Sequence, residues 1–429
     1  MDWAAALWFF GLFVLLLAIG APIAVALGAT GLILIWQFHL GMAAIGPTFY
    51  ASLAKFQLLA IPFFVMAGLI LERVGISERL VRLASLLIGP VHGGLALVAI
   101  VCCVFFAGIS GSGPADTAAL GTILIPAMAA RGYAKPFASA LIASGGSIAI
   151  IIPPSIAFII YGVITNTSIP ALFAAGVLPG LLVGACLAIP AYVIARRRGW
   201  RGERYGSRAE VLAALREAVW GLMAPLIILG GIYGGVFTPT EAAVVAVFYG
   251  LFVGLFIYRS LTLAALWRIL NDTAVSSAVV MLIVGFAGLY AWAGSTMGVI
   301  DRMTQGLLGL SKNPVVILWA INLLVFLAGY ILDGISIYYI FVPIIMPIMA
   351  AFGWDPVWIG VMLTVNIAIG QVTPPVAVNL YVAANIARLS FEEISRAVWP
   401  FVLAMLLALG IVVQWPALST WLPGIFRLK

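Results

Sequence analysis

Long apolar segments follow one another along most of this 429-residue chain, and charged residues are confined to the stretches between them. A helix needs about 20 apolar residues to cross the core of a bilayer. Segments near that length are residues 3–20, 22–38, 57–73, 136–166, 171–195, 221–236, 239–258, 273–295, 356–386 and 398–416. Amphipathic stretches between them are expected to form helices in the membrane interface: residues 74–89, 201–219, 260–272, 300–312 and 388–397. The pattern predicts an all-α polytopic membrane protein with about ten spanning helices.

Residues 95–130 and 314–350 are also apolar, but each consists of two runs of about 13 to 16 residues separated by polar, Gly-containing sequence. The polar inserts read GISGSGPAD (108–116) and AGYILDGIS (328–336). A helical run of about 13 residues is roughly 20 Å long, whereas the hydrocarbon core is about 30 Å thick. Each region is therefore predicted to be a re-entrant helical hairpin, which enters the membrane part-way and leaves on the same side.

The composition agrees with a membrane protein, because 65% of the residues are hydrophobic and only 8% are charged. A soluble domain could not cover its surface with so few charges. The net charge of +7 is therefore interpreted as a topology signal and not as a sign of nucleic-acid binding. With the Arg-rich stretch 196–216 in the cytoplasm, both termini are external. The first hairpin then enters from the cytoplasm and the second from outside. The basic residues left outside are Lys55, Arg302, Lys312, Arg427 and Lys429.

The chain repeats itself at an offset of 221 residues, as when Pro153-Pro154 matches Pro374-Pro375. Further matches are Ala107-Gly108 with Ala328-Gly329, Pro126 with Pro347, and Met128-Ala129-Ala130 with Met349-Ala350-Ala351. Residues 1–220 and 221–429 thus share one plan: three spans, a hairpin, a broken span and a last span. This odd number of crossings requires the second half to be inverted in the membrane. Inverted repeats with interrupted helices are the architecture of secondary transporters.

Both Pro-Pro pairs interrupt a predicted span, at 136–166 and at 356–386. Proline removes a backbone donor, and its ring frees carbonyl groups in the preceding turn. Freed carbonyls with Ser or Thr hydroxyls suit Na⁺, and the N-terminus of a half-helix suits an anion. The hairpins and broken spans contain no Lys or Arg, so an anionic substrate would rely on neutral donors and bound cations. The alternative is a plain proline kink with Gly for close packing, which the symmetric pairing of breaks with hairpins disfavours.

Three acidic residues leave structural and functional roles open. Asp116 and Asp333 lie at or beside the hairpin tips, where a carboxylate is usually functional, but Asp is also a strong helix N-cap. Asp116 would open the helix that follows the first tip. Glu241 follows Thr238-Pro239-Thr240, which favours a capping role at a helix start.

Gly108-Ile109-Ser110-Gly111 matches the GxSG pattern around the nucleophile of rhomboid-type enzymes, which makes an intramembrane protease an alternative. A serine nucleophile needs a base such as histidine. The two histidines, His39 and His92, both precede the first tip and lie outside the later spans. The sequence therefore predicts a transporter and not an enzyme.

Taken in order, five blocks resemble the large membrane subunit of TRAP (tripartite ATP-independent periplasmic) transporters. The blocks are GISGSGPADTAALGTILIPAMAARGY, GGSIAIIIPPSIAFIIYG, FTPTEAA, DGIS with VPIIMPI, and GQVTPPVAVNLYV. The resemblance implies a bacterial inner-membrane symporter of the ion-transporter superfamily that imports an organic acid, such as a dicarboxylate or sialic acid, with Na⁺. It implies no cofactor besides Na⁺ as the coupling ion. It also implies two partners, a small four-helix membrane subunit and a periplasmic substrate-binding protein. A stand-alone carboxylate/Na⁺ symporter of the same superfamily is the alternative.

The resemblance also implies an elevator-type mechanism, with a transport domain from residues 95–166 and 314–386 and a scaffold from the remaining spans. Carried over by motif, the Na⁺ ligands of the first half would be Ser110, Ser112, Ala149, Ile152 and Pro154. Those of the second half would be Asp333, Gly334, Gly370, Thr373 and Pro375. The substrate would bind between the tips, near Ser144, Asn366 and Asn379, with Asp116 as a further candidate.

Overall fold

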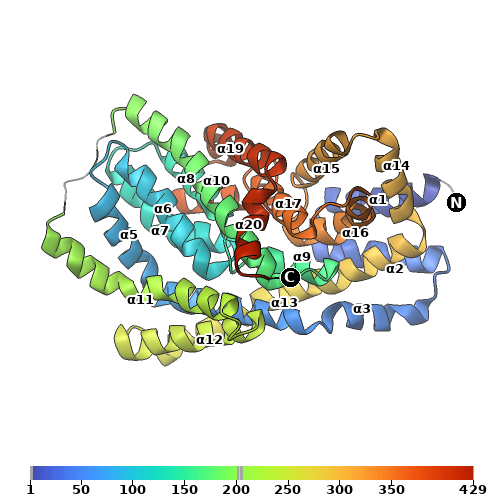
Figure 1. The fold of residues 1–429 in the computed structure, drawn as a ribbon, viewed down its shortest axis with the longest axis horizontal. Coiled ribbons are helices and arrows are strands. Elements are labelled where there is room, and N and C mark those ends of the chain that lie inside the picture. The colour runs from blue at the N-terminus through green and yellow to red at the C-terminus, as the bar shows by residue number, and fades with distance from the viewer. Residues whose placement is uncertain (1–2, 201, 203–205, 429) are drawn as a thin grey trace.

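The computed structural model describes residues 3–200, 202 and 206–428, and every regular element in these ranges is a helix (Figure 1). The first half contains α1 (Trp3–Ala18), α2 (Ile23–Gln37), α3 (Ile45–Leu53), α4 (Ala60–Arg73), α5 (Ile76–Ile88), α6 (Gly94–Ser110), α7 (Gly113–Ala130), α8 (Lys135–Gly146), α9 (Ile156–Thr165) and α10 (Ile169–Arg197). The second half contains α11 (Arg208–Tyr233), α12 (Pro239–Phe252), α13 (Leu263–Thr296), α14 (Val299–Leu310), α15 (Pro314–Ala328), α16 (Gly334–Phe352), α17 (Pro356–Gly370), α18 (Val378–Ala387), α19 (Phe391–Gln414) and α20 (Ala417–Ile425).

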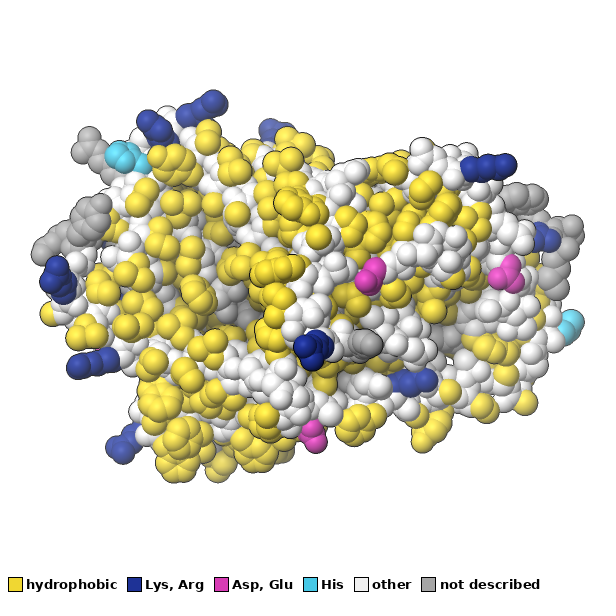
Figure 2. Space-filling model, viewed as in Figure 1, with side chains coloured by type: hydrophobic (Ala, Val, Ile, Leu, Met, Phe, Trp, Pro, Cys, Tyr) yellow, Lys and Arg dark blue, Asp and Glu magenta, His cyan; other side chains and the backbone are white. Residues whose placement is uncertain are grey.

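The predicted all-α membrane fold is confirmed. Seven helices in the described ranges are long and apolar enough to cross a membrane: Phe56–Arg73, Ile169–Arg197, Arg208–Tyr233, Pro239–Ile257, Leu263–Thr296, Gly334–Phe352 and Phe391–Gln414. The first two predicted spans form the shorter apolar helices α1 and α2, and each broken span forms two short helices. Hydrophobic side chains cover much of the face drawn in Figure 2, and most Lys and Arg side chains lie near its outline. Arg201, Arg204 and Lys429 of the topology prediction lie outside the described residues.

Three amphipathic segments were wrongly expected to be separate interfacial helices. Residues 201–219, 260–272 and 388–397 instead supply the first turns of the long helices α11, α13 and α19. The reason is where the capping residues lie. Ser207 with Glu210 caps the start of α11, and Ser390 with Glu393 caps the start of α19. Because no cap or break follows before the apolar part, the helix continues into the span. Of the five predicted segments, 74–89 and 300–312 form separate amphipathic helices, α5 and α14.

Three of the four arms of the predicted hairpins are longer than the length of about 13 to 16 residues that the sequence indicated. Helices α6 and α7 have 17 and 18 residues, and α15 and α16 have 15 and 19. The second arm of each hairpin gains length because its helix begins at the tip glycine, Gly113 or Gly334. Helix α16 is by itself long enough to span. Arm length alone therefore does not establish re-entry, which stays a prediction.

The helices pack in two groups (Figure 1). In one group, α2, α3 and α4 pack on the long helix α13, and α12 packs on α4 and α11. The other group contains the hairpins and broken helices, which interlock across the two halves. The second piece of the first broken helix, α9, packs on α16 and α17, and that of the second, α18, packs on α7 and α8. Helices α10 and α19, assigned to the scaffold from sequence, pack on each other and on this second group.

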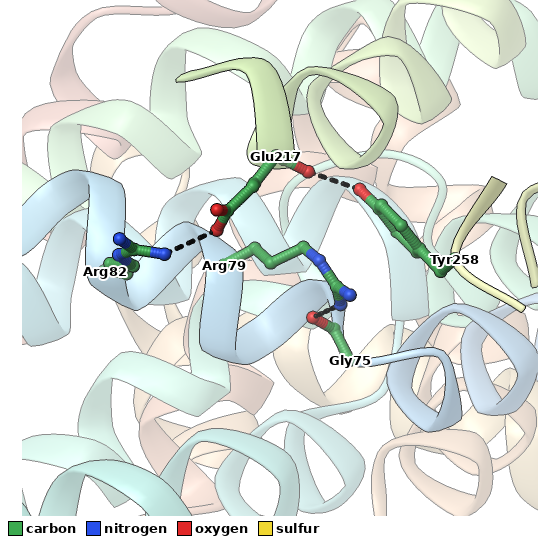
Figure 3. Close-up of polar contacts among 5 residues, drawn as sticks. All are labelled: Gly75, Arg79, Arg82, Glu217 and Tyr258. Carbon is green, nitrogen blue, oxygen red and sulfur yellow. Dashed lines mark hydrogen bonds and ion pairs between the residues drawn. The ribbon is translucent and has the colours of Figure 1, made fainter. Parts of the chain in front are cut away.

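Helix α5 is tied to α11 and to Tyr258 by the polar contacts in Figure 3. Arg82 forms an ion pair with Glu217 of α11 at 2.7 Å. Arg79 donates to the carbonyl oxygen of Gly75 at 2.6 Å, and its guanidinium lies 3.7 Å from the centre of the Tyr258 ring. The Tyr258 hydroxyl in turn donates to the backbone oxygen of Glu217. These contacts join α5, α11 and the end of the π-helical turn 253–257 that follows α12.

Candidate functional site

Each hairpin tip lies directly against the break in the broken helix of its own half. In the first half, a Cβ added to Gly111 would lie 2.4 Å from the carbonyl oxygen of Pro154. Gly111 also has φ +66°, a conformation that favours glycine. In the second half, a Cβ on Gly370 would lie 3.0 Å from the Cα of Gly329. The glycines thus let the backbone of the tip touch the backbone of the break.

The first break separates α8 from α9 and exposes carbonyl oxygens. A short 3₁₀ turn, 147–150, follows α8, and the cis Pro153-Pro154 bond lies beyond it. Ser155 caps α9 by accepting from Phe158 N at 3.4 Å, and it donates to the carbonyl of Ile150. Within the described residues, the carbonyls of Ile152 and Pro154 accept no hydrogen bond. They are therefore available as oxygen ligands beside the first tip.

The second break separates α17 from α18 and has a different cap. Its Pro374-Pro375 bond is also cis, and the Thr373 hydroxyl donates to the carbonyl of Ile369 at 2.7 Å. No side chain caps α18; the backbone N–H of Asn379 instead donates to the carbonyl of Gln371 at 3.1 Å. The Thr373 and Pro375 carbonyls accept no hydrogen bond from any residue that the structure describes.

The first tip places Asp116 inside the protein, in the first turn of α7 but not at its N-cap position. Helix α7 begins at Gly113 with Ser112 as its N-cap residue, so the expectation that Asp116 opens this helix was wrong. The Gly-Pro-Ala sequence supports helix three residues earlier than expected, because Pro is favoured in the first turn. Asp116 is fully buried and accepts a hydrogen bond from the Ser110 hydroxyl. Its other carboxylate oxygen has no partner among the described residues.

The second tip places Asp333 at the N-cap of α16. Its carboxylate accepts from Ile335 N at 3.0 Å and from the Ser336 hydroxyl. The capping role considered for this residue is therefore confirmed. The capping role of Glu241 is confirmed as well, because it accepts from Thr238 N at 2.8 Å while the Thr238 hydroxyl accepts from Glu241 N at 3.3 Å.

A cavity of about 220 Å³ lies between the two tips. Four of the predicted site residues line it, namely Ser112, Asp333, Gly334 and Gly370. The other lining residues are Gly111, Gly113, Pro114, Ile150, Ile156, Ala157, Val280, Gly329, Leu332, Ile335, Ile367, Gln371, Val376, Ala377 and Val378. None of these described residues is a Lys or Arg. The cavity is thus apolar with a few convergent polar groups, as small-molecule sites usually are.

The residues predicted to contact substrate do not line this cavity. Asn366 turns toward α15, where its amide donates to the backbone oxygen of Asn322 at 2.9 Å. Asn379 donates to the carbonyl of Ala143 at 3.2 Å. Ser144 is buried, and its hydroxyl has no partner within the described ranges. Asp116 contacts Ser110, as described above.

The remaining predicted Na⁺ ligands lie next to the cavity wall. Ser110, Ala149 and Thr373 are buried beside the tips and breaks, whereas Gln371, which the sequence interpretation passed over, lines the cavity. Gln371 directly follows Gly370 at the end of α17. A search for polar side chains flanking each Pro-Pro pair would have found it.

Comparisons with known proteins agree with the fold and the motifs. A model of the family described as "Tripartite ATP-independent periplasmic transporter, DctM component" matches residues 10–418. A protein of Oleidesulfovibrio alaskensis named isethionate TRAP transporter permease protein DctMQ is 41% identical over 97% of this chain, which spans 66% of that relative's length. The C4-dicarboxylate TRAP transporter large permease protein DctM of Rhodobacter capsulatus is 35% identical, over 99% of this chain and 100% of the relative.

A solved structure is similar in fold. The crystal structure of the Alcanivorax borkumensis YdaH transporter covers 89% of this chain, and 90% of its own chain is covered, with a TM-score of 0.64. The two sequences are only 16% identical, so the similarity concerns the fold alone.

Proposed function

We propose that this chain, which belongs to the DctM component family of tripartite ATP-independent periplasmic (TRAP) transporters, imports a small organic acid with Na⁺ across the bacterial inner membrane. A permease subunit of this family is a transporter component and not an enzyme, which removes the protease interpretation of Gly108 to Gly111. Two similar relatives are named for different anions, isethionate and C4-dicarboxylate. The proposal therefore commits to a small organic anion.

The observation that carries the proposal is the contact between each tip and its break around one cavity. Carbonyls of Ile152 and Pro154 in the first half, and of Thr373 and Pro375 in the second, lack hydrogen-bond donors in the described structure. Such oxygens at helix breaks suit Na⁺. Two cations beside a cavity without Lys or Arg would supply the positive charge that an organic acid requires.

The partners follow from the family. We propose that a periplasmic binding protein delivers the substrate and that a small four-helix membrane subunit completes the transporter. Membership in the TRAP family favours this arrangement over the stand-alone symporter. In the elevator mechanism that we propose, the hairpins and broken helices move against α2–α4 and α11–α13, with α5 and α14 as the connecting helices.

The test is uptake into proteoliposomes that contain both membrane subunits, with loaded binding protein outside. Substrate should accumulate only under an inward Na⁺ gradient. Accumulation that persists when K⁺ replaces Na⁺ on both sides would refute the coupling. Accumulation without the binding protein or the small subunit would favour the stand-alone carrier.

Substitutions of single hydroxyls test the Na⁺ sites. Ser110→Ala and Thr373→Ala should each raise the Na⁺ concentration for half-maximal uptake by about tenfold, the effect of losing about 1.4 kcal/mol of ion binding. The matched control is Thr296→Ala, because Thr296 also donates to the carbonyl four residues earlier, at 2.9 Å, but lies at the exposed end of α13. Unchanged Na⁺ dependence of uptake in both variants would show that the Na⁺ sites lie elsewhere.

A further inference from the structure

Gln371 is the one polar side chain that the second break contributes to the cavity lining. The neighbouring lining residues of this break are Gly370, Val376, Ala377 and Val378. At the offset of 221 residues, Gln371 corresponds to Ile150, which lines the same cavity from the first break. The two halves therefore present an amide at one wall and an aliphatic side chain at the equivalent position of the other.

The amide of Gln371 lies against the start of α7. A Cβ on Gly113 would lie 2.3 Å from Gln371 Oε1 and 3.0 Å from Asn379 Nδ2, so both amides press against the glycine that begins α7. Gln371 Oε1 is enclosed there, while the side chain as a whole remains partly exposed and lines the cavity. The side chain of Gln371 thus lies between the start of α7 and the cavity.

Asn379 lies beside Gln371 at the same glycine, Gly113. It is fully buried, and its Nδ2 donates to the carbonyl of Ala143 at 3.2 Å. A carbonyl oxygen only accepts, so the donor end of the Asn379 amide is fixed. Both the Nδ2 of Asn379 and the Oε1 of Gln371 lie next to Gly113. Asn379 Oδ1 lies beside the same glycine, 3.2 Å from the added Cβ, and like Gln371 Oε1 it has no hydrogen-bond partner among the described residues.

A second donor set lies next to Gln371, at the start of α7. No side chain caps this 18-residue helix, and in the described structure the N–H groups of Gly113 and Ala115 donate to no backbone acceptor. Uncapped first-turn N–H groups attract anions. The start of α16 is different, because the Asp333 carboxylate already occupies it. The acidic residue in the first turn of α7, Asp116, accepts from the Ser110 hydroxyl and does not cap the helix. The N–H groups at the start of α7 therefore stay open to an anionic group in the cavity, whereas those of α16 are already capped.

We propose that Gln371 is the specificity-determining residue for the anionic group of the transported acid. Its Nε2 donates to the anionic oxygens together with the free N–H groups at the start of α7. The aliphatic wall around Ile150 and Ile156 receives the apolar part of the substrate. This inference rests on the proposed function, since it assumes that the cavity between the tips holds the transported acid.

The experiment measures anion binding without the binding protein, whose own selectivity would otherwise dominate. Both membrane subunits are purified in nanodiscs, and thermal unfolding is followed while isethionate or succinate is titrated in NaCl. Gln371→Leu should raise the half-saturating anion concentration by about tenfold or more, as expected for the loss of a hydrogen bond to a charged group. Gln371→Glu should raise it further, because a carboxylate then faces the anion. Gln305→Leu, the same change on the exposed side of α14, is the matched control.

The outcomes separate this inference from the proposed function. Stabilisation by Na⁺ alone should be the same in Gln371→Leu and in the unaltered protein. If neither anion stabilises the unaltered complex in NaCl, the proposed function and this inference both fail. If an anion stabilises it and Gln371→Leu binds that anion with unchanged affinity, only this inference is overturned.

A double-mutant cycle tests how Gly113 acts. Gly113→Ala should displace the Gln371 amide and raise the half-saturating anion concentration several-fold, because the added Cβ meets Oε1. In a Gln371→Ala background the same change should have little further effect. Equal effects in both backgrounds would show that Gly113 does not act through Gln371 and would overturn this positioning.

Discussion

The two hairpin tips occupy equivalent places in the repeat but begin their second helices differently. Ser112 and Asp333 correspond at the offset of 221 residues, and each is the N-cap residue of the helix that follows. Asp333 accepts hydrogen bonds from its own helix, whereas the side chain of Ser112 caps nothing. One helix start is therefore occupied by a carboxylate and the other is open. The two tips thus share a backbone plan, but only the second has a carboxylate that caps its helix.

The largest loss of stability is expected where the first tip contacts the break between α8 and α9. Gly111→Ala should lower the free energy of unfolding by roughly 2–4 kcal/mol, because it combines left-handed strain with a Cβ 2.4 Å from the Pro154 carbonyl. The measurement is thermal unfolding of the purified permease in nanodiscs.

Gly132→Ala is the matched control for this prediction. Gly132 has φ +82°, but nothing lies within 4 Å of an added Cβ. This variant should show only the strain of about 1–2 kcal/mol. Equal losses in the two variants would mean that the tip does not depend on its contact with the break.

A smaller effect is expected at the caps. Asp333→Ala should lower the free energy of unfolding by about 1 kcal/mol, because two capping hydrogen bonds are lost, whereas Asp333→Asn should retain most of the stability. Ser112→Ala, at the equivalent position, should change the same unfolding measurement little. A loss at Ser112 as large as that at Asp333 would remove the contrast between the tips.

The smallest loss of stability is expected at the amphipathic helices α5 and α14. Helix α5 is tied by the ion pair of Arg82 with Glu217, whereas α14 is joined to α16 by the Thr304 hydroxyl, which donates to the carbonyl of Ile344 at 3.0 Å. Arg82→Ala should cost less than about 1 kcal/mol, because both partners are about half exposed. This loss of unfolding free energy should be smaller in high salt. A salt-independent loss would show that the pair acts by packing and not by charge.

Most of the fold could be predicted from sequence, but helix continuity and the capping at the tips could not. Apolar length and Pro-Pro pairs are local properties, so the spans and both breaks were located. Residues 260–272 were separated from their span because their polarity differs from it, yet the backbone continues as helix α13. Asp116 was expected to open the helix after the first tip, but α7 already begins at Gly113. The sequence missed this earlier start because Gly-Pro resembles turn sequence.

The sequence by itself determined an inverted-repeat membrane protein with two interrupted spans, because apolar length, proline and the internal repeat do not depend on how the helices pack. Only the tertiary structure decided which polar side chains reach the cavity. Asn366 and Gln371 lie five positions apart on the same segment, yet one amide donates to Asn322 and the other lines the cavity. The rotation of a helix against its neighbours sets that outcome, and it arises from contacts between segments far apart in the chain.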